Sequence, residues 1–78
     1  MKVMVEIFTG KIFYVQVEDN ATVLDLKKEI SAQEKLPDYQ RLILLFDNNV
    51  VDQNEASLVD YGIQDSSHLY LFFNTLTD

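Results

Sequence analysis

Few side chains in this sequence could support catalysis, and they are spread along the chain. His68 is the single histidine, and no nucleophile stands beside it. There is no cysteine, which excludes a thiolate metal site. The acidic side chains considered as catalytic carboxylates are Asp19, Asp25, Glu29, Asp52, Asp60 and Asp65. They fall at predicted turns and on the outer helix face, whereas paired catalytic carboxylates need a shared cleft that shifts their pKa values. Because there is also no glycine-rich phosphate loop, we expect no enzyme activity, no metal site and no cofactor.

The net charge restricts the classes of binding partner. Thirteen acidic residues against six basic ones give a net charge of −7. Nucleic acid is not an expected partner, because phosphate contacts need clustered lysine and arginine, and an anionic membrane surface would repel the chain. The longest apolar runs, LILLF and LYLFF, are far shorter than the roughly 20 residues that span a bilayer. The simplest role of the charge is to keep one small domain in solution.

Hydrophobic periodicity predicts the elements of the first half of the chain. Apolar residues alternate over residues 1–7 and again over residues 12–17, which predicts two strands joined by a glycine turn. A helix should begin after Thr22, a good N-cap, and end near Glu34, because Pro37 disfavours helical geometry in the residue before it. Its predicted inner face carries Val23, Leu26, Lys27 and Ile30.

The second half of the chain is predicted to add three strands to the same sheet. Residues 40–46 form a third strand, a turn follows at residues 47–49, and residues 50–52 form a short fourth strand. Residues 54–63 are predicted to form a loop with one helical turn that ends at Gly62. Residues 67–73 are predicted to form the last strand. The order indicates an α+β fold in which one main helix covers one face of a mixed sheet.

Several stretches of the chain carry a resemblance to a known family. They are Met1 with Val3 and Val5, TGK at residues 9–11, VE at residues 17–18, Thr22, Lys27, Ile30, Pro37, QRLI at residues 40–43 and LVDYGIQ at residues 58–64. In these positions the sequence resembles ubiquitin and the ubiquitin-like domains. The resemblance implies the β-grasp fold over residues 1–73, with residues 74–78 as a flexible tail or linker stub. Fold alone does not fix function, so the function needs its own argument.

The resemblance implies a shallow apolar patch on the exposed sheet face that binds partners. The positions that match this patch are Phe8, Ile43, Tyr70 and Phe72, with Arg41 beside it and Phe46 in the turn after the third strand. His68 faces outward on the last strand and joins this set, although an ordinary surface histidine is the simpler interpretation. Aromatic side chains are enriched in binding hot spots, which favours a partner-binding surface. The alternative is that these rings pack among themselves or against a neighbouring domain of the same polypeptide.

A second exposed set is predicted on the first hairpin. Met4, Ile12 and Tyr14 should be cross-strand neighbours on one outer face. They indicate a second interface, with another domain or with a second copy of the chain. The alternative is β-propensity alone, because such residues suit strands.

The C-terminal residues bear on whether the domain is conjugated to other proteins. Conjugated members of the family end in Gly-Gly, whereas residues 74–78 contain no glycine. The two family positions most associated with chain linkage match Asp47 and Asp65. We therefore expect a domain that is not conjugated, within a larger protein. A covalent modifier processed from a longer precursor, and a structural domain packed on its parent chain or on a second copy, remain as alternatives.

The expected function is that of a non-enzymatic interaction module. The resemblance implies that its partners are ubiquitin-receptor helices, ubiquitin-associated domains or proteasome subunits, in the ubiquitin–proteasome pathway. Such a module would act in the cytoplasm, the nucleus or both. A monomer is expected, with a homodimer as the alternative.

Overall fold

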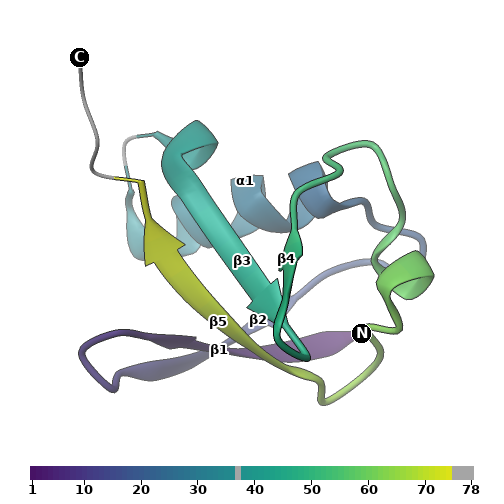
Figure 1. Ribbon diagram of the computed structural model, residues 1–78, viewed down its shortest axis with the longest axis horizontal. Helices are drawn as coiled ribbons and strands as arrows, with labels where there is room; N and C mark the ends of the chain where they lie inside the picture. The colour runs from purple at the N-terminus through teal and green to yellow at the C-terminus, as the bar shows by residue number, and fades with distance from the viewer. Residues whose placement is uncertain (37, 75–78) are drawn as a thin grey trace.

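The computed structural model describes residues 1–36 and 38–74. Within these residues, five strands form one mixed sheet in the order β2-β1-β5-β3-β4. The strands are β1 (Lys2–Ile7), β2 (Ile12–Gln16), β3 (Leu42–Phe46), β4 (Asn49–Val51) and β5 (His68–Phe73). The helical elements are α1 (Val23–Glu34) and two short 3-10 helices, η1 (Tyr39–Arg41) and η2 (Leu58–Tyr61). This is the predicted α+β, β-grasp arrangement (Figure 1).

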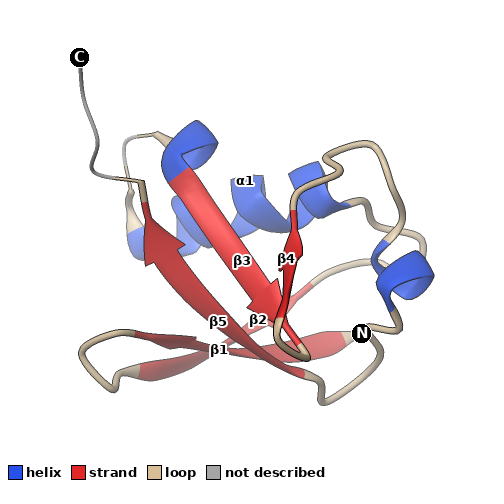
Figure 2. Ribbon diagram, viewed as in Figure 1, coloured by secondary structure: helices blue, strands red, loops and turns tan. Residues whose placement is uncertain are grey.

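The sheet and α1 form two layers with the core between them. β1 pairs antiparallel with β2 and parallel with β5, which places the first hairpin beside the last strand. Alternate residues of the strands are buried. They face α1, which lies across one side of the sheet (Figure 2). The buried strand residues are Val3, Val5, Phe13, Val15, Leu42, Leu44, Val51, Leu69 and Leu71. The opposite face of the sheet is left to face outward.

The predicted limits of α1 are confirmed. Thr22 is the N-cap and forms a capping box with Asp25, in which each residue's backbone N–H donates to the other's side chain. The helix ends at Lys35, which takes a left-handed conformation with φ 56° and donates its N–H to the Ser31 carbonyl. None of the helices in the described part of the chain is long and apolar enough to cross a membrane.

The inner face of α1 also follows the prediction. Val23, Leu26 and Ile30 are fully buried, and Lys27 is buried with them. Its ammonium group donates to Asn54 Oδ1 at 3.0 Å, so the buried amine has a partner. Burial lowers the pKa of Lys27, because the charged form is desolvated.

The third and fourth strands differ from the prediction at their ends. The third strand begins at Leu42, because residues Tyr39–Arg41 form η1, whose N-cap Asp38 accepts the Gln40 N–H. The turn after it has only two residues, Asp47 and Asn48, both with positive φ. This geometry matches the right-handed strand twist and is well suited to Asn and Asp. As a result, the fourth strand begins one residue earlier than predicted.

The loop before the last strand is held by Tyr61. Its hydroxyl accepts the Gln53 N–H at 3.0 Å, which ties η2 to the segment after β4. Gly62 closes η2 with φ 83°, a conformation that favours glycine. The predicted tail falls outside the described residues except for Asn74, whose N–H donates to the Arg41 carbonyl at 2.8 Å.

Candidate functional site

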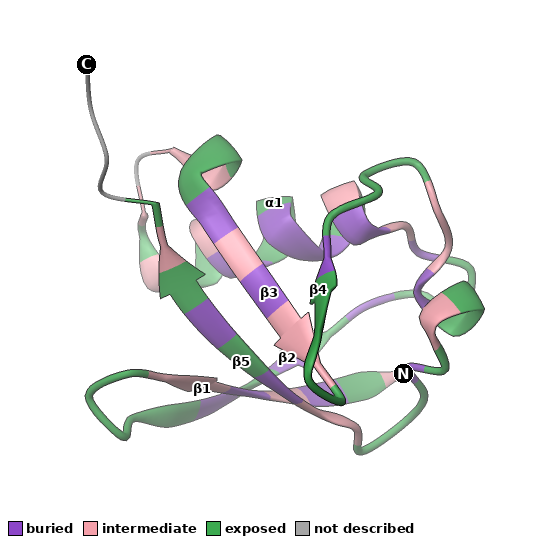
Figure 3. Ribbon diagram, in the orientation of Figure 1, coloured by how far each residue is buried: buried purple, intermediate pink, exposed green. Residues whose placement is uncertain are grey.

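One row of cross-strand neighbours crosses the outer face of the whole sheet. In strand order it consists of Ile12, Glu6, Tyr70, Leu45 and Val50. Because paired residues project from the same face, all five point away from α1. Figure 3 shows the resulting alternation of buried and more exposed positions along β3 and β5. This register determines which of the predicted patch residues are neighbours on the outer face.

Ile43 and Phe72 lie next to this row as directly paired neighbours of β3 and β5. Tyr70 is 43% exposed and Phe72 is 40% exposed, while Ile43 is half-buried. Three of the four predicted patch residues therefore lie side by side on the outer face. The exposed parts of Tyr70 and Phe72 leave apolar area open to a partner.

Sequence reasoning missed two apolar members of this surface. Leu45 is half-buried on β3, two residues after Ile43, and pairs with Tyr70. Val50 is 50% exposed on β4 and pairs with Leu45. The period of two along the third strand would have identified Leu45. Val50 needs the register across the β3–β4 turn, which follows from the two-residue length of that turn. We call Ile43, Leu45, Val50, Tyr70 and Phe72 the apolar patch.

His68 lies at the polar centre of the outer face. Its Nε2 is 2.9 Å from Glu6 Oε1, and its ring stacks on Tyr70 with 4.8 Å between centroids and 22° between planes. The side chains are 37% exposed for His68 and 28% exposed for Glu6. His68 is thus packed between the patch and β1, and together with Glu6 it forms the polar centre of the surface.

Phe8 lies at the end of the sheet. It is 71% exposed in the turn after β1. Its ring meets the Phe73 ring edge to face, with 6.5 Å between centroids and 88° between planes. Phe73 alternates with Phe72 and packs against the core, so this contact draws the Phe8 ring toward the end of β5. The ring contact of Phe8 is therefore with the core side of β5, at the end of the sheet.

Arg41 is the last residue of η1 and directly precedes β3. Its Nε donates to Asp38 Oδ2 at 3.3 Å, and its Nη1 lies 3.5 Å from the Asn74 carbonyl oxygen. Both partners of the ion pair are about half exposed, so the pair contributes little to stability. Asp38 accepts from one of the five N–H donors of the guanidinium group that was predicted to reach a partner carboxylate.

The predicted place of Phe46 is wrong. It is the last residue of β3 and pairs with Asn49, so it does not lie in the turn. It shares the inner side of β3 with Leu42 and Leu44 and packs against the core. A Cβ on Gly62 would lie 3.9 Å from its ring. Phe46 is therefore separated from the outer face by the sheet itself.

The second predicted set lies on the same outer face as the apolar patch. Met4 pairs with Tyr14 on one side and with His68 on the other, so β1 joins the two sets. Ile12 and Tyr14 are about half exposed, while Met4 is partly covered. The Lys2 ammonium lies 5.1 Å from the Tyr14 ring centroid, a cation–π contact. The two predicted surfaces are two halves of one surface that meet at Glu6 and His68.

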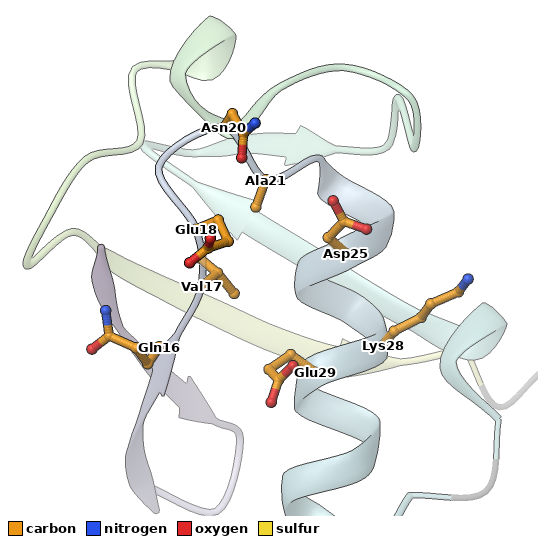
Figure 4. A pocket seen from close by; sticks show the side chains of 8 residues that line it. All are labelled: Gln16, Val17, Glu18, Asn20, Ala21, Asp25, Lys28 and Glu29. Carbon is orange, nitrogen blue, oxygen red and sulfur yellow. The ribbon is translucent and has the colours of Figure 1, made fainter.

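A separate groove of about 520 Å³ lies between the end of β2 and the first turns of α1. Its lining includes Glu18, Asp25 and Glu29, with Lys28 at one side (Figure 4). Hydrogen bonds from the backbone and hydroxyl of Thr22 lower the pKa of Asp25, whereas a general acid needs a raised one. Among the described residues, no group of three or more His, Asp or Glu side chains is placed to hold a metal ion. The carboxylate of Asp25 caps the helix.

The lowered pKa of Asp25 predicts a pH-dependent contribution to stability. The folded-state pKa of Asp25 lies below its ordinary value of 3.8. Its carboxylate therefore stabilises the fold at pH values above 3.8, and this stabilisation is lost as the pH falls through the folded-state pKa. Asp25→Asn should therefore be less stable than the wild type at neutral pH, and the difference should shrink in acid. Urea unfolding of both proteins at neutral and at acidic pH measures this difference in the free energy of unfolding. Glu29→Gln on the same helix is the control, and a difference that is the same at both pH values would contradict the prediction.

Comparisons with known proteins cover nearly the whole chain. The ubiquitin family model matches residues 2–76. The solution NMR structure of a ubiquitin-like domain from an Arabidopsis thaliana protein superimposes with a TM-score of 0.86. Its sequence is 28% identical, and the match covers 97% of this chain and 79% of that one. Both matches include all five strands of the outer face.

Proposed function

Because the chain belongs to the ubiquitin family, we propose that it is a non-enzymatic interaction module that docks a helix of a partner protein on the outer face of its sheet. The observation that carries the proposal is the apolar patch. Tyr70 and Phe72 stay largely exposed beside Ile43 and Leu45 on neighbouring strands, although the core below them is fully buried. An apolar surface of several side chains on a folded domain is typical of a binding site.

The size of the patch suits a helix. Neighbouring strands lie about 4.8 Å apart, and a helix with its side chains is about 10–12 Å wide. A helix seated over β5 and β3 would therefore cover Phe72, Tyr70 and their partners on β3. The aromatic side chains would supply most of the binding energy, since they bury a large area and have few rotatable bonds. We expect micromolar affinity, because such an interface is small.

The partners we propose are ubiquitin-receptor helices, ubiquitin-associated domains or proteasome subunits. Such partners would link this domain to the ubiquitin–proteasome machinery in the cytoplasm or nucleus. The support is family membership together with the position of the patch on the exposed sheet face. A patch that binds partners in this way requires no cofactor and no catalytic group.

Calorimetric titration tests the proposal with two probes, a ubiquitin-associated domain and a ubiquitin-interacting helix. We expect at least one of them to bind with micromolar affinity and a negative heat-capacity change, since apolar surface is buried. Absence of measurable binding for both probes at millimolar excess would contradict the proposed partner classes.

A further inference from the structure

The position of Glu6 on the outer face indicates which side chains a partner helix must present. Glu6 pairs with Ile12 on one side and with Tyr70 on the other, so its carboxylate stands between the two apolar halves of the outer face. Its side chain is already only 28% exposed. We propose that the partner helix is basic and presents a lysine or arginine side chain to Glu6. This inference rests on the proposed function, because it assumes that a helix docks on the patch.

Docking would remove much of the remaining water from Glu6. Burial of a carboxylate among apolar side chains is costly unless an opposite charge accompanies it. His68 is the hydrogen-bonding neighbour, at 2.9 Å from Glu6 Oε1. That contact occupies one of the acceptor positions of the carboxylate. A cationic side chain from the partner would satisfy both the charge and the remaining acceptor positions of the carboxylate.

The charges around the face favour the same partner. Asp47 lies in the β3–β4 turn, and Asp65 accepts the Lys2 backbone N–H at 2.8 Å beside β1. The Lys2 ammonium lies over Tyr14 at the far edge of the sheet. The other nearby cations are already paired: Lys11 with Glu34 at 2.9 Å, and Arg41 with Asp38 at 3.3 Å.

The net charge of the chain, −7, adds to this field. An approaching basic helix is therefore attracted over a distance, whereas an acidic helix meets like charges at the rim and at Glu6. Charge complementarity selects a basic amphipathic helix over an acidic one with the same apolar face.

Two synthetic amphipathic peptides with identical apolar residues test the inference, one with lysine and one with glutamate on either side of the apolar stripe. Their affinities are measured for the wild type, Glu6→Gln and Glu29→Gln. We expect the lysine peptide to bind the wild type about tenfold more tightly than the glutamate peptide. Glu6→Gln should reduce this ratio, whereas Glu29→Gln removes the same charge from α1, on the other side of the sheet, and should leave most of the ratio intact.

The outcomes separate the inference from the function on which it rests. If both peptides bind and the ratio is near one, or is unchanged by Glu6→Gln, the inference is wrong and the docking function stands. If neither peptide binds, and the ubiquitin-associated domain and ubiquitin-interacting helix also fail, the docking function fails and the inference with it. Should Glu6→Gln not fold, Glu6→Ala takes its place in the same comparison. Added salt must weaken the lysine peptide and strengthen the glutamate peptide, and the absence of this opposite response overturns the inference.

Discussion

Replacing Leu69 with alanine should lower the free energy of unfolding by about 2–5 kcal/mol. Leu69 is fully buried on β5, and its strand position pairs with Val5 of β1. Truncation removes the transfer free energy of the deleted carbons and leaves a cavity beneath α1. A domain of this size is stabilised by roughly 4–12 kcal/mol in total, so this single change should remove a large part of its stability.

Urea unfolding followed by circular dichroism measures the effect of Leu69→Ala. Val59→Ala is the matched control, because Val59 is 54% exposed on η2 and loses little buried area. The control should change the free energy of unfolding by less than about 0.5 kcal/mol. If the two variants unfold at the same urea concentration, β5 is not the centre of the core and the described packing is wrong.

The second large effect is expected from Tyr70→Ala on binding of the partner helix. Tyr70 lies between Glu6 and Leu45 on the outer face and stacks on His68. Its truncation removes an aromatic anchor from the middle of the docking surface. The affinity should fall on the order of 30-fold, the size of a hot-spot loss of about 2 kcal/mol.

Tyr14→Ala makes the same chemical change at the far edge of the sheet. Tyr14 is 54% exposed on β2, two strands away from Tyr70 in the sheet order. A helix centred on β5 and β3 would leave it at the margin, so its truncation should weaken binding less than about threefold. Calorimetry on both variants gives the comparison. A larger effect at Tyr14 would move the docking site to the first hairpin.

Local sequence patterns predicted most of the elements because their causes are local. The period of two over residues 67–73 predicted the last strand, and in β5 Leu69 and Leu71 are buried while Tyr70 and Phe72 are exposed. Thr22 identified the start of α1 because capping depends on residues three positions apart. The third strand ends at Phe46 as predicted, but the placement of Phe46 in the turn beside the patch was wrong. Phe46 was assigned from its place in the family pattern, whereas its own alternation with Leu42 and Leu44 places it on the core side.

The features that the sequence did not reveal depend on register between distant segments. Glu6 and His68 are 62 positions apart and meet only because β1 and β5 pair in parallel. The same pairing joins the two predicted apolar sets into one surface. Val50 enters the patch only through the two-residue turn that fixes its pairing with Leu45. Periodicity gives the face of each side chain but does not give its neighbour on the next strand.

The central claim is that the outer face of β5 and β3 is the docking surface. The most direct test is an NMR titration of the isotopically labelled chain with a ubiquitin-associated domain and, separately, with a ubiquitin-interacting helix. Docking on this face should shift amides mainly at Ile43, Leu45, Tyr70 and Phe72, and Ile43→Ala should abolish these shifts. Shifts confined to the α1 side of the molecule, or shifts that persist unchanged in Ile43→Ala, would contradict this claim.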